Sequence, residues 1–169
     1  MMTSPTSIRM PTSEPFRMLG IDPGYGRMGF AVLERSNKKE TLIEAGCIET
    51  SAASPHDERL EIIGDSLKKL ISKHRPHGFA IEKLFLSANQ KTAMRVAETR
   101  GVALYLASGL PIYEFSPPEI KLAVCGYGKA DKKQVEAMVR LIFKPTGPLL
   151  DDAMDAIAVA FTALGRISH

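Results

Sequence analysis

The sequence predicts an α/β domain in which a central sheet of mixed strand direction carries helices on both faces. Three apolar, strand-like runs follow one another closely after a short N-terminal segment, as antiparallel neighbours do. Further along, short apolar runs alternate with segments of helical periodicity, as in strand–helix units. The 169 residues, 44% hydrophobic and 24% charged, fit a single globular domain with a sizeable core.

The chain begins with a segment that we expect to be a flexible tail. Residues 1–15 are rich in Ser, Thr and Pro and lack periodicity, so the domain is placed at residues 16–169. The apolar runs then predict strands at residues 17–22, 29–33 and 42–48. A tight turn, Pro23-Gly24-Tyr25-Gly26, separates the first two.

The next segments predict a helix, a strand and a longer helix. Ser54 as a hydroxyl cap and Pro55 at the first position mark the start of the first helix. A short buried strand is expected at residues 78–82 and a long helix at residues 89–108. On the long helix three small residues fall four apart, which predicts a smooth ridge that packs closely against the sheet or another helix: Ala93, Ala97 and Gly101.

The C-terminal third predicts a last strand and three helices. The strand is expected at residues 112–115, and a short helix starting with Ser116-Pro-Pro follows it to about residue 124. Asp131 and Gln134 have the spacing of a capping box for the next helix. The final helix begins at Asp151 or Asp152 and carries an apolar stripe to residue 164.

Bulk composition excludes several classes of protein. No run approaches the ~20 apolar residues of a membrane-spanning helix, and the N-terminus lacks the pattern of a secretory signal. Two cysteines, Cys47 and Cys125, predict neither a disulfide framework nor a cysteine-based zinc site. We therefore expect a cytoplasmic protein without a membrane partner. The net charge of +3 is weak support for a nucleic-acid partner, although residues 83–144 hold ten basic against five acidic side chains.

Two carboxylates come at the ends of apolar strands. Asp22 closes the first run just before the glycine-rich turn, and Glu82 closes the run at residues 78–82. Taken alone, Asp22 is best explained as a turn residue that accepts bonds from backbone N–H groups. Glu82 has low strand propensity and is costly to bury unpaired, although an ion pair with Lys83 or Arg100 would also explain it.

Two further carboxylates share one face of the final helix. Asp152 and Asp155 are three residues apart, so their Cβ atoms lie roughly 5–6 Å from each other. Asp151 is already a good candidate for the helix cap. Asp155 lies inside the helix beside its apolar stripe, so it is not explained as a capping residue. Two like charges this close need a neutralising partner. We take Asp152 rather than Asp151 as the second member, because only Asp152 is three residues from Asp155.

The four acids together predict a metal site. Strand ends at neighbouring positions of a sheet, with one face of a packed helix, bring carboxylates to one point. Hard oxygen ligands of this kind suit Mg²⁺. Two such ions about 3.5–4 Å apart activate a water and stabilise the leaving oxygen in phosphodiester cleavage. The sequence therefore predicts a nuclease that depends on a divalent metal.

Motifs in the expected order resemble the RuvC family of Holliday junction resolvases. The first acidic motif is similar to Leu19-Gly20-Ile21-Asp22-Pro23-Gly24, and the second to Ala80-Ile81-Glu82 with Phe85 behind it. The last motif, an Asp-x-x-Asp at the start of the final helix, resembles residues 152–156. The family's middle portion is similar to four segments: Arg100-Gly101, Phe115-Ser116-Pro117, the surroundings of Lys121, and residues 126–135.

This resemblance implies a ribonuclease H-like fold with a mixed five-stranded sheet and an active site of two Mg²⁺ ions, for which Mn²⁺ can substitute. The ions would be held by Asp22, Glu82, Asp152 and Asp155. It implies a homodimer that nicks two strands of a four-way junction symmetrically during homologous recombination and DNA repair. The ends left are 5′-phosphate and 3′-hydroxyl. A partner of the RuvAB branch-migration type is also implied.

Five residues are expected to contact DNA. Lys121 and Lys132 match family lysines, Phe85 matches an aromatic that stacks on bases, and Arg100 belongs to a matched motif. Independently of the resemblance, Lys132 and Lys133 stand at a helix N-terminus, where free N–H groups favour phosphate. A solvated helix start, and a core position for Phe85, are the structural alternatives.

Departures from the family pattern and rival functions leave alternatives open. Glu98 places a negative charge where the family has a neutral residue, which puts helix-level DNA or dimer contacts in doubt. A ribonuclease of rRNA processing would share the motifs, and an actin- or sugar-kinase-like nucleotide-binding protein would share the first of them. A DNA-binding protein without catalysis is disfavoured by the intact set of four acids.

Overall fold

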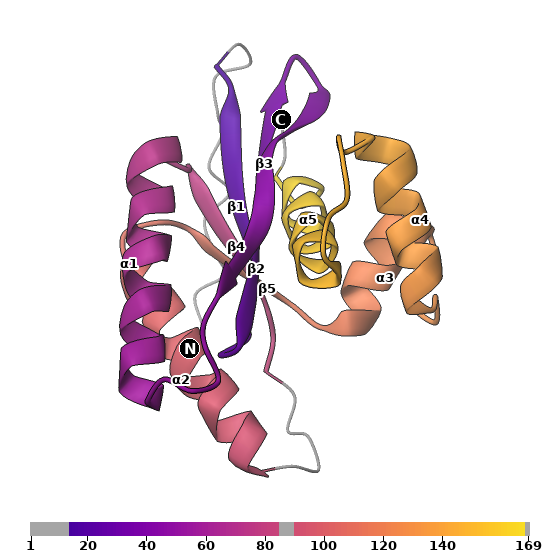
Figure 1. The fold of residues 1–169 in the computed structure, drawn as a ribbon. Coiled ribbons are helices and arrows are strands. Elements are labelled where there is room, and N and C mark those ends of the chain that lie inside the picture. Colours follow the sequence, from indigo (N-terminus) through magenta and orange to yellow (C-terminus); the bar gives the residue numbers. More distant parts are fainter. Residues whose placement is uncertain (1–13, 85–89, 168–169) are drawn as a thin grey trace, which may run out of the picture.

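A five-stranded sheet runs through the middle of the molecule, with helices on both of its faces (Figure 1). The structure is a computed structural model that describes residues 14–84 and 90–167. The strand order is β3-β2-β1-β4-β5. The first three strands in the chain pair antiparallel, whereas β4 lies parallel to β1 and β5 parallel to β4. The predicted fold class is confirmed.

The strands lie where the apolar runs predicted them, and two are longer. Antiparallel β2 and β3 extend past their apolar runs because a tight hairpin joins them, with Asn37 and Lys38 at φ 50° and 62°. Positive φ at both central residues matches the right-handed twist of the paired strands. The strand bounds are β1 Phe16–Asp22, β2 Arg27–Ser36, β3 Lys39–Glu49, β4 Gly78–Glu82 and β5 Ile112–Phe115.

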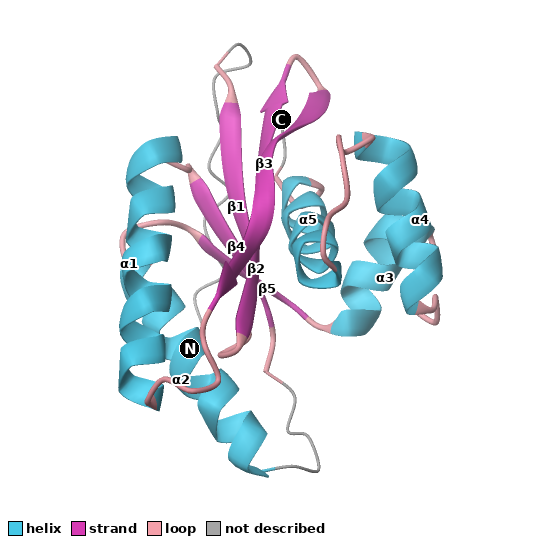
Figure 2. Cartoon of the chain, in the orientation of Figure 1, coloured by secondary structure: helices cyan, strands magenta, loops and turns pink. Residues whose placement is uncertain are grey.

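The helices form two layers (Figure 2). On one face of the sheet lie α1 and α2; on the other, α5 packs directly on the sheet and α3 and α4 pack outside it. Each layer encloses its own cluster of buried apolar side chains, one under α1 and α2 and one around α5. The helix bounds are α1 His56–His74, α2 Gln90–Leu106, α3 Pro117–Cys125, α4 Lys132–Phe143 and α5 Asp151–Leu164.

Two glycines let α5 approach the sheet unusually closely. A Cβ atom at Gly20 in β1 would lie 2.4 Å from the carbonyl oxygen of Ala156, and one at Gly29 in β2 would lie 1.9 Å from that of Asp152. Real Cβ atoms essentially never come this close, so only glycine fits at either position. These contacts fix the N-terminal end of α5 against the strands that carry the other predicted site residues.

Two predictions about helix caps are wrong in detail: Ser54 does not cap α1, and Asp151 does not cap α5. Helix α1 begins after Pro55, which is its N-cap, and no side chain bonds to that end. Asp151 is the first helical residue of α5 rather than its cap, which is Leu150. The capping boxes of α3 and α4 are present, the second being the one predicted at Asp131.

The predicted ridge on the long helix does not pack as expected. Ala93 is buried, but Ala97 and Gly101 are exposed, and a Cβ added at Gly101 would meet nothing within 4 Å. The helix instead buries the face that carries Thr99 and Ala103. The spacing of small residues therefore did not identify the buried face of α2. Leu104 and Leu106, which neighbour Ala103 in the chain, pack partly buried on the same apolar cluster as Ala103.

No helix within residues 14–84 and 90–167 is both long enough and apolar enough to cross a membrane.

Candidate metal and nucleic-acid site

Two of the predicted acids lie side by side at the C-terminal edge of the sheet. Strands β1 and β4 are parallel neighbours, and Ile21 pairs with Ile81. The next residues along, Asp22 and Glu82, therefore end adjacent strands at the same height. Side chains at equivalent positions of parallel strands point to the same face. That face is the one on which α5 packs, because Met18 and Ala80, which lie on the same faces of β1 and β4 as the two acids, are buried in the cluster around α5.

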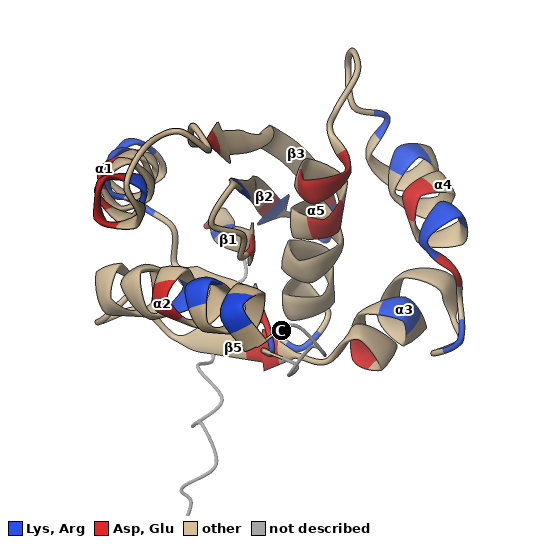
Figure 3. Cartoon of the chain, turned by 60° about the horizontal axis from the view of Figure 1, so that its bottom comes forward, with Lys and Arg blue, Asp and Glu red and all other residues tan. Residues whose placement is uncertain are grey.

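The other two predicted acids come from the first turns of α5. Figure 3 shows acidic residues gathered at one end of this helix, with basic residues on the neighbouring α4. Asp152 is held beside β2 by the close contact of its backbone with Gly29, which itself pairs with Asp22. Asp155 lies less than one turn further on. Asp151, by contrast, has a side chain that is 63% exposed.

Electrostatics indicates that these four carboxylates lie close to one another, around Asp22. The pKa of Asp22 is raised from 3.8 to about 7, chiefly by burial and then by the charges of Asp155, Glu82 and Asp152, in that order, against a smaller opposing effect of Lys132. Asp151 does not figure among the causes. A carboxyl whose pKa is raised by three others lacks a neutralising charge of its own. Such a cluster is an attractive position for a cation.

The pKa values of two further members move in the same direction. Burial raises the pKa of Glu82, as does the charge of Asp155, while Lys121 opposes both effects. Burial also raises the pKa of Asp155, although Lys132 counteracts it. Lys121 and Lys132, two of the lysines predicted to contact DNA, therefore already lie close to the acids.

Basic side chains from other elements engage the two acids of α5. The Nε atom of Arg27, the first residue of β2, bonds to Oδ2 of Asp152. The Nζ atom of Lys132 lies 3.2 Å from Asp155 and 3.5 Å from Asp151. Within the part of the chain that the structure describes, no three His, Cys, Asp or Glu side chains are arranged to hold a metal as they stand.

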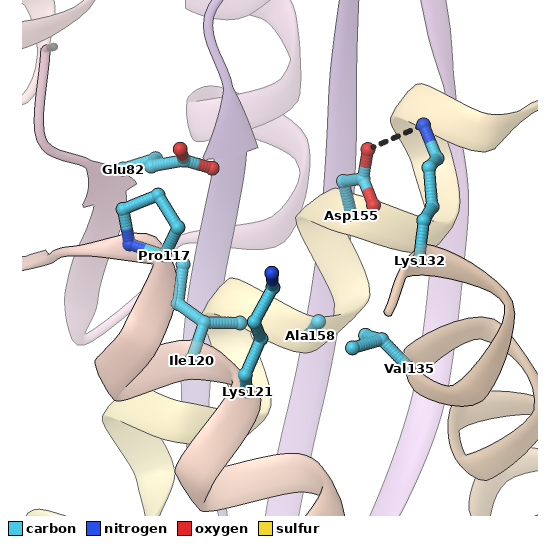
Figure 4. A pocket seen from close by; sticks show the side chains of 8 residues that line it. All are labelled: Glu82, Pro117, Ile120, Lys121, Lys132, Val135, Asp155 and Ala158. Carbon is cyan, nitrogen blue, oxygen red and sulfur yellow. Dashed lines mark hydrogen bonds and ion pairs between the residues drawn. The ribbon is translucent and has the colours of Figure 1, made fainter. Parts of the chain in front are cut away.

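A pocket of about 170 Å³ opens beside these acids (Figure 4). The carboxylates of Glu82 and Asp155 face it from opposite sides, and the amino groups of Lys121 and Lys132 approach from α3 and α4. Its floor is apolar. The lining residues are Glu82, Pro117, Ile120, Lys121, Lys132, Val135, Asp155 and Ala158.

The remaining predicted DNA contacts have different surroundings. Phe85 lies outside the described residues. Lys133 is exposed at the start of α4. Arg100 is only 15% exposed: it bonds to the carbonyl of Glu82 at 3.3 Å and pairs with Glu114 at 3.0 Å. Arg100 thus links α2 to the C-terminal ends of β4 and β5, which is a structural role separate from its predicted contact with DNA.

Sequence reasoning missed two features of the site region. Arg27 gave no signal, because its partner Asp152 is far away in the chain and only the fold brings them together. Glu98, whose negative charge departs from the family pattern, pairs with His56 at the start of α1. Its charge is therefore engaged between two helices.

The donor set fits a hard divalent cation. All four acids supply oxygen, which is the ligand that Mg²⁺ and Mn²⁺ prefer, and the described residues bring no thiol or imidazole cluster to this edge. Lysines at the rim would draw a phosphate towards the acids. This combination serves phosphoryl transfer chemistry, in which metal ions bridge carboxylates and phosphate oxygens.

Comparison with known proteins agrees with the site. The model of the family described as crossover junction endodeoxyribonuclease RuvC matches residues 18–163. The chain belongs to the RuvC family. A RuvC of Pelotomaculum thermopropionicum is 41% identical over 146 residues, covering 85% of this chain and 89% of the relative. A RuvC of Thermosipho melanesiensis is 44% identical over 148 residues, covering 86% and 94%.

The fold agrees as well. The structure of Thermus thermophilus RuvC in complex with a Holliday junction substrate superposes with a TM-score of 0.80 at 30% identity, covering 87% of this chain and 92% of that chain. The RuvC family consists of metal-dependent nucleases, so the acidic edge of the sheet, with its flanking lysines, is the candidate active site of this chain.

Proposed function

We propose that this chain is a crossover junction endodeoxyribonuclease that resolves four-way DNA junctions in homologous recombination and repair. The observation that carries the proposal is the meeting of four carboxylates at one edge of the sheet, Asp22 and Glu82 from strands and Asp152 and Asp155 from α5. A RuvC relative of the same fold is seen with a Holliday junction substrate. The relatives favour neither the rRNA-processing nor the nucleotide-binding alternative.

The four acids would hold two Mg²⁺ ions, with Mn²⁺ as a substitute. When bound, such ions activate the attacking water and stabilise the leaving oxygen. Asp22 and Glu82 provide the fixed part of this site, because they end neighbouring buried strands. Asp152 and Asp155 provide the part that must turn away from Arg27 and Lys132. Cleavage would leave 5′-phosphate and 3′-hydroxyl ends.

Lysines at the rim would position the DNA backbone. Lys121 and Lys132 reach the pocket from two different helices, so together they can hold one phosphate over the acids. Lys132 and Lys133 also begin α4, where free backbone N–H groups and the helix dipole favour an anion. We retain Arg100 and Phe85 as further DNA contacts.

Paired nicking requires two active sites, so we also propose a homodimer. Helix α2 exposes an apolar stripe made of Met94, Ala97, Gly101 and Tyr105, with Met94 65% and Tyr105 77% exposed. A RuvAB-type branch-migration complex is the proposed partner of the assembled enzyme. Both cysteines in the structure are free thiols, in keeping with the cytoplasm as the proposed location.

The test is cleavage of a labelled four-way junction and a matched linear duplex, each with Mg²⁺ or with EDTA. We expect paired, symmetric nicks confined to the junction and dependent on the metal. Asp155→Asn should lower the cleavage rate by at least about a hundredfold while junction binding persists. Metal-dependent cleavage by Asp155→Asn at the wild-type rate would contradict the proposed site. Preferred cleavage of structured RNA would instead support the rRNA-processing alternative.

A further inference from the structure

Arg27 lies at the edge of the candidate active site in a position that neither the motifs nor the proposed mechanism explains. It is the first residue of β2, and its side chain is 44% exposed. It forms an ion pair with Asp152, whose side chain is 25% exposed. An arginine is therefore held on a carboxylate that is proposed to hold metal.

The fold makes this contact hard to avoid. Arg27 and Gly29 are two residues apart on β2, so both point to the face on which α5 packs. Gly29 brings the backbone of Asp152 against β2. Arg27 is the next residue on the same face of β2, at the N-terminal end of the strand. The guanidinium thus reaches Asp152 from a fixed strand, through its Nε atom.

The ion pair and a metal ion compete for Asp152. A divalent cation beside the carboxylate would lie a few ångström from the guanidinium, and like charges at that distance repel by about 1 kcal/mol or more even in a well-solvated setting. The described acids do not converge on a metal position as they stand, and Asp152 is one of those turned towards a base. If the arginine left Asp152, the repulsion of the metal would fall and the carboxylate would be free to turn towards the other acids.

We propose that Arg27 is a DNA-phosphate-binding residue that is held on Asp152 until the substrate arrives. A backbone phosphate takes over the guanidinium, for which a planar fork of donors is well suited, and Asp152 is released to the metal. Binding of junction DNA and binding of metal are thereby coupled through one side chain. This inference rests on the proposed function, because it takes Asp152 as a metal ligand and DNA as the substrate.

A purely structural role for Arg27 predicts the opposite sign. If the arginine permanently oriented Asp152 through one oxygen while the other bound metal, its loss would weaken metal binding, as loss of groups that support metal ligands generally does. If Arg27 competes with the metal, its loss strengthens metal binding in the absence of DNA. The sign of the change in metal affinity therefore separates the two roles.

The experiment compares wild type, Arg27→Gln and Arg17→Gln. Arg17 is a matched control: its Nε atom also bonds to a carboxylate, that of Glu34, with similar exposure, but at the opposite end of the same pair of strands. Titration calorimetry with Mg²⁺ in the absence of DNA should show an affinity about threefold to tenfold higher for Arg27→Gln. Arg17→Gln should bind Mg²⁺ as wild type does.

Junction binding gives a second readout that does not depend on cleavage. In Ca²⁺, Arg27→Gln should bind the four-way junction several-fold more weakly than wild type. The slope of log affinity against log salt concentration should become shallower by about one, because one phosphate contact is lost. In EDTA the loss should be smaller, because there Asp152 competes for the arginine of the wild type.

Two negative results have different meanings. If wild type binds Mg²⁺ but Arg27→Gln binds it equally well or more weakly, the inference is overturned and the proposed function stands. If wild type binds no Mg²⁺ at all, the proposed metal site fails, and this inference fails with it. Unchanged junction affinity of Arg27→Gln in Ca²⁺ would also overturn the inference.

Discussion

Asp22 combines burial with the repulsion of three neighbouring carboxylates, and this combination has a cost in the metal-free protein. Because the pKa of Asp22 is raised from 3.8 to about 7, the folded chain keeps a proton that the unfolded chain releases. The free energy of unfolding therefore falls as the pH rises from about 4 to about 7, and the full penalty remains above that range. A divalent metal would remove the penalty by neutralising the cluster.

This cost predicts that Asp22→Asn stabilises the metal-free protein. In EDTA at about pH 8, the free energy of unfolding should rise by roughly 2–4 kcal/mol relative to wild type. Near pH 4, where Asp22 is protonated in the folded chain and roughly half protonated in the unfolded chain, the difference should shrink to below about 1 kcal/mol. Urea denaturation at the two pH values measures both quantities. Equal stability of the two proteins at about pH 8 would contradict the assigned environment of Asp22.

At the scale of elements, the position of α5 depends on two glycines rather than on side-chain contacts alone. Gly29 is the more informative, because it separates Asp22 on β1 from Asp152 on α5. A methyl group here would lie 1.9 Å from a backbone oxygen, and backbone cannot move aside as the end of a flexible side chain can. The same contact that packs the helix therefore also sets the spacing of the acids.

Gly29→Ala should accordingly cost at least about 2 kcal/mol of stability and lower junction cleavage more than junction binding. The control is Gly165→Ala just after α5, where the atom nearest to the added Cβ is 3.4 Å away, an ordinary contact. That change should stabilise the chain by about 0.4–1 kcal/mol, because Gly165 has right-handed helical backbone (φ −64°) and alanine restricts the unfolded chain. Urea denaturation, junction binding and junction cleavage of both variants provide the comparison. Wild-type stability of Gly29→Ala would show that α5 is free to shift.

The sequence predicted elements well and their mutual contacts poorly. Apolar runs and caps placed all five strands, and strand ends with the spacing of Asp152 and Asp155 indicated the acids, because these signals are local. The buried face of α2 was assigned wrongly, since it depends on which large side chains fit against α1 and the sheet. The bond between Arg27 and Asp152 was out of reach for a similar reason: two distant segments meet only when β2 and α5 pack.

At the scale of the whole molecule, the stripe on α2 is the surface that a monomer leaves unexplained. Met94, Ala97, Gly101 and Tyr105 follow one another at helical spacing, and large apolar side chains exposed along one line favour an interface. A groove next to the stripe runs between α1 and α2, lined in part by Leu60 and Val102. A twofold axis along this face would let the stripe of each copy pack against the other.

Tyr105→Glu should therefore convert the proposed dimer into a monomer. A charge placed in an apolar interface is left desolvated and unpaired, and such changes cost several kcal/mol. Analytical ultracentrifugation measures the oligomeric state, and the junction assay shows whether the two nicks remain paired; we expect single, unpaired nicks and weaker junction binding.

Leu141→Glu is the control, because Leu141 is 67% exposed on α4, outside the stripe, and its variant should remain dimeric. A dimeric Tyr105→Glu protein would place the interface elsewhere on the molecule, whereas a monomeric wild type that still made paired nicks would show that the junction itself brings two copies together.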